Sequence, residues 1–129
     1  MRILTTLATL LAAAAIAGCT SAPIQNVSDA TVVSPAGKPL SEEQVKTAII
    51  RAGLALGWQM KEAGPGKIAG SLALRKHVAE VEIPYSATTY SITYKSSVNL
   101  DENSGMIHKN YNGWIQNLTK GINAQLLAS

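Results

Sequence analysis

Residues 68–95 read IAGSLALRKHVAEVEIPYSATTYSITYK, and the alternation within this stretch decides the fold. Apolar side chains occupy every second position in three successive runs: 68–74, 79–83 and 90–94. A period of two is typical of antiparallel strands that bury one face and leave the other in water. A shorter candidate strand over 58–63 precedes the turn signal Gly64-Pro65-Gly66. The sequence therefore predicts a four-stranded antiparallel sheet.

Helical periodicity appears on both sides of these strands. Ser41-Glu42-Glu43-Gln44 is a capping-box pattern, and the apolar spacing that follows predicts a helix over 41–56. A second helix is predicted over 109–127, with an apolar stripe at Tyr111, Trp114, Ile115, Leu118, Ile122 and Leu126. The expected fold class is α+β, a two-layer sandwich in the order α-β-β-β-β-α. We expect both helices to pack on one face of the sheet within a domain of residues 41–129.

The first residues form a segment of a different kind. Met1-Arg2 is followed by fourteen uncharged residues, Ile3 to Ile16. As a helix they would span about 21 Å, which is short of the roughly 30 Å hydrocarbon core of a bilayer. A charged start, a short apolar run and small residues at the end are typical of a secretory signal peptide, here residues 1–18.

The apolar run ends with Ile16-Ala17-Gly18-Cys19, which resembles the lipobox of bacterial lipoproteins. Ile16 is a mild departure, since Leu is commoner at that position. The resemblance implies acylation of Cys19, cleavage between Gly18 and Cys19, and a protein attached to a membrane by its acyl chains. Cys19 is the only cysteine, so no intramolecular disulfide can form. The alternative is an ordinary cleaved signal peptide that leaves a free thiol.

The residue after the cysteine helps to predict whether the protein is sorted to the inner or the outer membrane. In the sorting scheme that the lipobox resemblance implies, Asp at this position retains a lipoprotein at the inner membrane. Thr20 stands there instead, which favours the outer membrane, facing the periplasm. Residues 19–40 are expected to be the lipidated cysteine and a flexible tether, reaching roughly 25 Å. Val32-Val33 could alternatively form a short strand or dock on the domain.

Two further segments resemble a family of small bacterial lipoproteins to which no activity is assigned. They run from Ala79 through Tyr85 into Tyr90 to Ser96, and from Ile107 to Trp114. With the Gly57-Trp58 junction, the likeness covers most of residues 41–127. It implies the same order of helices and strands and adds no activity.

The distribution of charge argues against nucleic-acid binding. Without residues 1–18, the chain carries ten Lys and Arg against eight Asp and Glu. Its densest group of basic residues is the pair Arg75-Lys76, which is much smaller than the basic clusters that nucleic-acid binding requires. We expect no nucleic-acid partner.

Catalytic and metal motifs are weak. His77 and His108 are the only histidines, too few for a zinc site, and His108 stands where it would cap the second helix. Asp101-x-Asn103-x-Gly105 begins like a calcium loop but lacks the later ligands. No catalytic residue, metal or cofactor is therefore predicted. A small hydrolase built around a histidine is the least favoured class.

Two binding surfaces are predicted. The water-facing side of the sheet mixes small and charged side chains and suits a docked envelope protein or peptidoglycan: Ala69, Ser71, Ala73, Arg75, Glu80, Glu82, Ser91, Thr93 and Lys95. The alternative is an aromatic pocket for a lipid or glycan between helices and sheet, formed by Trp58, Tyr85, Tyr111 and Trp114. The preferred function is thus a membrane-anchored, non-enzymatic binding protein of the cell envelope, with its oligomeric state left open.

Overall fold

The computed structural model describes residues 20–129, so the predicted signal peptide and Cys19 lie outside the described residues. The described chain has α+β architecture, as predicted. Its elements are β1 (Ser21–Pro23), β2 (Val27–Thr31), the short 3-10 helix η1 (Pro35–Gly37), α2 (Glu42–Ala55), β3 (Gln59–Glu62), β4 (Lys67–Leu74), β5 (His77–Pro84), β6 (Thr89–Val98), β7 (Met106–His108) and α3 (Lys109–Leu127).

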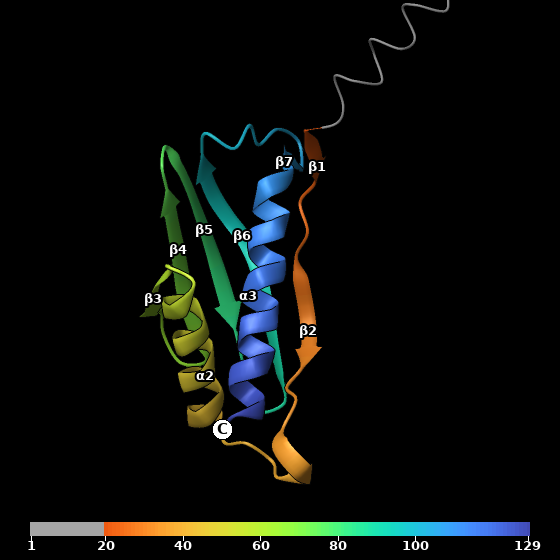
Figure 1. The fold of residues 1–129 in the computed structure, drawn as a ribbon, viewed down its shortest axis with the longest axis vertical. Coiled ribbons are helices and arrows are strands. Elements are labelled where there is room, and N and C mark those ends of the chain that lie inside the picture. Colours follow the sequence, from red (N-terminus) through yellow and green to blue (C-terminus); the bar gives the residue numbers. More distant parts are fainter. Residues whose placement is uncertain (1–19) are drawn as a thin grey trace, which may run out of the picture.

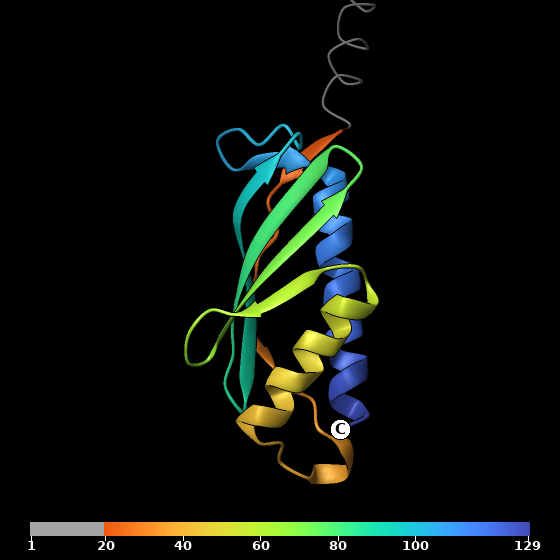
Figure 2. The ribbon, with the colours of Figure 1, turned by 90° about the vertical axis from the view of Figure 1, so that its left-hand side faces the viewer.

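The main sheet has five antiparallel strands in the order β2-β6-β5-β4-β3, and β1 pairs with β7 in a separate two-stranded sheet. Helices α2 and α3 lie together on one face of the main sheet, and Figure 2 shows the two layers from the side (Figures 1 and 2). The core fills the space between the layers, where α2, α3 and the strands contribute buried residues: Val45, Ile49, Ile68, Val81, Ile83, Ile92, Leu118 and Ile122.

Both helices begin where the sequence predicts. The Ser41 hydroxyl accepts from the Gln44 backbone N–H (3.1 Å), and the Gln44 side chain accepts from the Ser41 N–H (2.9 Å), which completes the capping box. His108 caps α3, because its Nδ1 accepts from the Asn110 backbone N–H at 3.2 Å. Each cap satisfies a donor that the first helical turn leaves without an intrahelical partner.

The alternation predicted for the central strands is confirmed. In β4, Ile68, Gly70 and Leu72 are buried while the intervening side chains stay accessible, and β5 repeats this pattern. Gly70 belongs to the buried face for a steric reason. A Cβ there would lie 3.0 Å from Val81 Cγ2 and 3.4 Å from Trp58 Cε3. The side chains of Val81 and Trp58 therefore pack directly against the backbone of β4 at Gly70, where a larger residue would not fit.

The prediction of a flexible tether is wrong for residues 21–33, which form strands or pack against the core. Ser21–Pro23 form β1 and Val27–Thr31 form β2, and β2 adds a fifth strand to a sheet that we expected to have four. Val32 and Val33 pack against the core, as the docked alternative proposed. The Val32 N–H donates to the Thr88 carbonyl oxygen at 2.9 Å. The N-terminal segment thus covers the free edge of β6, which would otherwise present unpaired backbone groups.

Asn112 of α3 holds this segment in place. Its Oδ1 accepts from the Gln25 backbone N–H at 3.0 Å, and its Nδ2 donates to the Pro23 carbonyl oxygen at 2.9 Å. Asn112 is the one buried polar residue identified among residues 20–129. Two further backbone bonds fasten the segment, from Ile24 N–H to Gly105 and from Lys109 N–H to Thr20. Within residues 20–129, neither helix is both long and apolar enough to cross a membrane.

Candidate functional site

The face of the main sheet that points away from the helices is the first candidate site. We call it the outer sheet face and define it by the accessible positions of β3 to β6: Gln59, Lys61, Lys67, Ala69, Ser71, Ala73, Glu80, Glu82, Ser91, Thr93 and Lys95. Its central positions lie side by side because Ser71 pairs with Glu80 and Glu82 pairs with Thr93. No helix of residues 20–129 lies over this face (Figure 2).

Charges of both signs alternate on the outer sheet face. Glu82 lies between two lysines, with carboxylate oxygens 3.9 Å from Lys67 Nζ and 3.9 Å from Lys95 Nζ. The Ser96 hydroxyl donates to Glu80 Oε2 at 2.8 Å. Exposed pairs of this kind contribute at most about 1 kcal/mol to stability, so these charges remain free to exchange partners.

A shallow depression lies at the centre of this face. Its volume is about 240 Å³, and its lining combines small residues with longer side chains: Gln59, Lys61, Ala69, Gly70, Ser71, Glu80, Val81 and Lys95. Lys95 reaches it from a bulge in β6, where Tyr94 pairs with Val81 and Ser96 pairs with Glu80. Small residues surrounded by charged ones let a partner backbone approach closely while its polar groups find partners.

The structure changes the membership of this face in two ways: one predicted residue leaves it and three others join it. Arg75 does not lie on it but in the β4–β5 turn, where its φ is +57°. Gln59 and Lys61 of β3, and Lys67 at the start of β4, belong to it although they were not among the predicted residues. The signal was available, since Gln59 and Lys61 are polar and alternate with Trp58 and Met60.

The four predicted pocket aromatics are not brought together. Trp58 and Tyr111 are buried in the core. Tyr85 lies at the opposite end of the sheet from Tyr111, joined to Tyr90 by a β-bridge and to Gly66 by a backbone hydrogen bond. Trp114 is half-buried on α3 with its ring centroid 6.4 Å from that of His77. The residues predicted to line one pocket therefore occupy separate sites.

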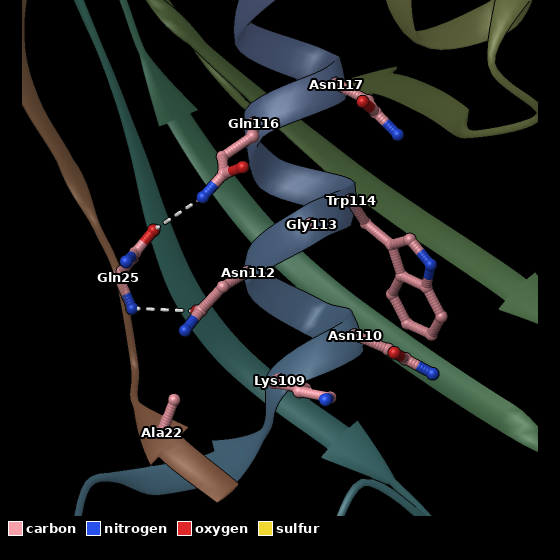
Figure 3. A pocket seen from close by; sticks show the side chains of 9 residues that line it. All are labelled: Ala22, Gln25, Lys109, Asn110, Asn112, Gly113, Trp114, Gln116 and Asn117. Carbon is pink, nitrogen blue, oxygen red and sulfur yellow. Dashed lines mark hydrogen bonds between the residues drawn. The ribbon is translucent and has the colours of Figure 1, made fainter. Parts of the chain in front are cut away.

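Trp114 instead borders a hollow on the surface of α3 (Figure 3). The hollow has a volume of about 520 Å³, and amide side chains dominate its lining: Gln25, Asn110, Asn112, Gln116 and Asn117. Gln116 Nε2 donates to Gln25 Oε1 at 3.3 Å across it. Gly113 leaves its centre open, because a Cβ there would meet nothing within 4 Å. Asn110 and Asn117 project from the same side of α3 as the Trp114 ring (Figure 3), and amides that both donate and accept beside an aromatic ring suit a polyhydroxylated ligand.

The two histidines serve local structure and differ in tautomer. His77 Nδ1 lies 2.7 Å from the Asn99 carbonyl oxygen, which only accepts, so this nitrogen carries a proton. His108 Nδ1 accepts from a backbone N–H and so carries none. Among residues 20–129, no three His, Cys, Asp or Glu side chains gather as a metal would require.

Tyr111 is a core residue whose hydroxyl group is in an unusual environment. Its hydroxyl is buried without a hydrogen-bond partner in the described structure, and its ring meets the Tyr94 ring edge-on at 5.5 Å. Burial raises the pKa of Tyr111 well above its ordinary value near 10. Because the folded protein keeps this proton at a pH where the unfolded chain releases it, stability falls as the pH rises above about 10.

We expect Tyr111→Phe to be as stable as the natural protein, or more stable, at pH 8, because it removes an unpartnered hydroxyl. It should also lose less stability between pH 8 and pH 10.5. Tyr90→Phe is the matched control, since Tyr90 donates to Asn123 Oδ1 at 2.9 Å and its loss costs about 1 kcal/mol. Urea unfolding measures both. A Tyr111→Phe variant destabilised as much as Tyr90→Phe at pH 8 would contradict this assignment.

Comparison of the chain with protein-family models, with curated proteins and with solved structures found no match.

Proposed function

We propose that this chain is a lipid-anchored protein of the cell envelope that binds another envelope protein or the cell wall and catalyses no reaction. Acylation at Cys19 would hold it at the outer membrane, facing the periplasm. The sequence Ile16-Ala17-Gly18-Cys19 and its resemblance to a lipobox support the anchor. Several acyl chains anchor a domain stably, because each buried CH₂ contributes about 0.8 kcal/mol.

The observation that carries the binding role is the open outer sheet face. Helices α2 and α3 cover only the opposite side of the sheet, and the exposed side has a depression whose lining includes the small residues Ala69, Gly70 and Ser71. Lys61, Lys95 and Glu80 stand around that depression and offer both signs of charge to a partner. A catalytic role finds less support, since the two histidines are committed to local hydrogen bonds.

Site-specific photocrosslinking in living cells tests this role. A photoreactive residue placed in turn at Ser71, Glu82 and Thr93 should give a discrete crosslinked product. The same probe at Arg51 of α2 and Lys120 of α3, both exposed on the helical side, should give none. A product of one sharp mass identifies a protein partner, and a ladder removed by a cell-wall hydrolase identifies peptidoglycan. Absence of any product at all three sheet positions would refute docking through this face.

A second candidate function is glycan binding at the α3 hollow, favoured by its amide lining beside Trp114. Titration with oligosaccharides that contain N-acetylglucosamine should then change the tryptophan fluorescence. Trp114→Phe should abolish the change, because the remaining Trp58 is buried in the core. An unchanged signal in the natural protein would remove this candidate.

A further inference from the structure

The first described residues lie at one end of the long axis of the domain. Thr20 follows Cys19 directly, and its carbonyl oxygen accepts from the Lys109 N–H at 3.0 Å. Ser21 is already paired with His108 in the β1–β7 sheet. An extended residue spans at most about 3.6 Å, so a group attached to Cys19 stays close to this end of the domain. Residues 21–31 were expected to belong to a flexible tether, but they contribute two strands to the domain and so do not separate it from Cys19.

Three segments lie at this same end of the long axis: the β4–β5 turn, the end of β6, and β7, with β7 next to β1 and the β4–β5 turn on the other side of this end (Figure 1). The β4–β5 turn and the end of β6 are joined by two hydrogen bonds, since Asn99 Nδ2 donates to the Lys76 carbonyl oxygen at 2.7 Å and His77 Nδ1 donates to the Asn99 carbonyl oxygen at 2.7 Å. We call this region the anchor end and define it by its exposed residues: Leu74, Arg75, Lys76, Val98, Asp101, Glu102, Met106 and Lys109.

Half of the large exposed apolar side chains of residues 20–129 lie at the anchor end. Six large hydrophobic residues are exposed among residues 20–129, and three of them lie here: Leu74, Val98 and Met106, at 47%, 53% and 39% exposure. Arg75 and Lys76 stand beside Leu74 at the tip of the β4–β5 turn. Asp101 and Glu102 face the same end, so with Lys109 its formal charge is nearly balanced. Exposed apolar residues beside long cationic side chains are typical of contact with a membrane interface.

We propose that the anchor end rests on the lipid headgroups, with Leu74, Val98 and Met106 in contact with the membrane surface. This inference depends on the proposed acylation of Cys19. An anchor so close to the domain holds these side chains at a high local concentration of lipid, so individually weak contacts suffice. Because the charges nearly balance, the contact does not require anionic lipid. The strands of the main sheet then run away from the membrane, and the outer sheet face stays open to the side.

Lipid-borne quenchers test the contact in the full-length protein. The protein is produced in cells that acylate lipoproteins, with a single added cysteine at position 74, 98 or 106 that carries a fluorescent label. Leu127 is the matched control, since it is 54% exposed at the end of α3, away from the anchor end. The labelled proteins are reconstituted into phosphatidylcholine vesicles with and without phosphatidylglycerol, containing lipids brominated close to the headgroup.

Probes at positions 74, 98 and 106 should lose most of their fluorescence in both vesicle types, and the probe at 127 should keep it. Equal emission at all four positions in an acylated protein would overturn the membrane contact and leave the proposed anchor intact. Emission that depends on protein density but not on the quencher would assign the end to a second copy, which also overturns the contact. An intact mass without acyl groups would overturn both proposals.

Discussion

Replacing Asn112 by alanine is expected to destabilise the domain by about 2–4 kcal/mol, because two backbone groups lose their partners in a largely buried site. The groups are the Gln25 N–H and the Pro23 carbonyl oxygen, 3.0 and 2.9 Å from the Asn112 amide. The loss should be local at first. Hydrogen exchange should accelerate over residues 21–33 before it accelerates in β4 and β5, since the amide joins this segment to α3.

Asn117→Ala is the matched control, since Asn117 is exposed on the same helix. It should change stability by less than about 0.5 kcal/mol. Urea unfolding gives the two free energies, and mass-resolved hydrogen exchange locates the change. Equal stability of the two variants, or unaltered exchange over 21–33 in Asn112→Ala, would show that the N-terminal segment is held by other contacts.

Cys19→Ala should abolish stable membrane attachment. If the lipobox operates as proposed, the variant cannot be acylated, and it accumulates as an uncleaved precursor or in the soluble fraction. The expected effect is large, because all acyl chains are lost together and each contributed many CH₂ groups at about 0.8 kcal/mol. Fractionation of cells that express the two proteins measures the change.

Thr20→Asp provides the control for this experiment. It leaves Cys19 in place and preserves the Thr20 backbone carbonyl that accepts from Lys109. The variant should remain acylated and membrane-bound, but it should move from the outer to the inner membrane in a cell with two membranes. Cys19→Ala with an unchanged acylated mass would contradict the anchor, whereas unchanged sorting of Thr20→Asp would contradict only the outer-membrane assignment.

Elements with strong periodicity could be predicted from the sequence. The alternation over 68–94 marked the central strands, and the apolar stripes marked both helices, because each element buries one face against the other layer. The strand β2 could not be recognised in this way. Its sequence VSDAT is short and polar, and a bulge between Val27 and Ala30 breaks its alternation. Ser and Asp are residues that favour turns, so the Ser28-Asp29 pair suggests a turn and not a strand. In the structure Asp29 has a φ of +48°, which lies outside the range of regular strands.

The candidate site was predictable in part for the same reason. The pleat of the sheet places Ser71, Glu80, Glu82 and Thr93 on one face, as alternation requires. Asn112 gave no such signal, because an asparagine beside an apolar helical stripe is usually solvated, and only the position of β1 and β2 makes it a partner. The aromatic residues were misjudged because sequence spacing does not specify which end of a layer each ring occupies.

The intact mass of the protein extracted from membranes tests the central claim most directly. The proposal of a lipid-anchored envelope protein predicts a chain that begins at Cys19 and carries one diacylglyceryl group and one further acyl chain. Peptide mapping should place both groups on Cys19. A chain that retains residues 1–18, or one that is cleaved elsewhere and carries no lipid, would contradict it.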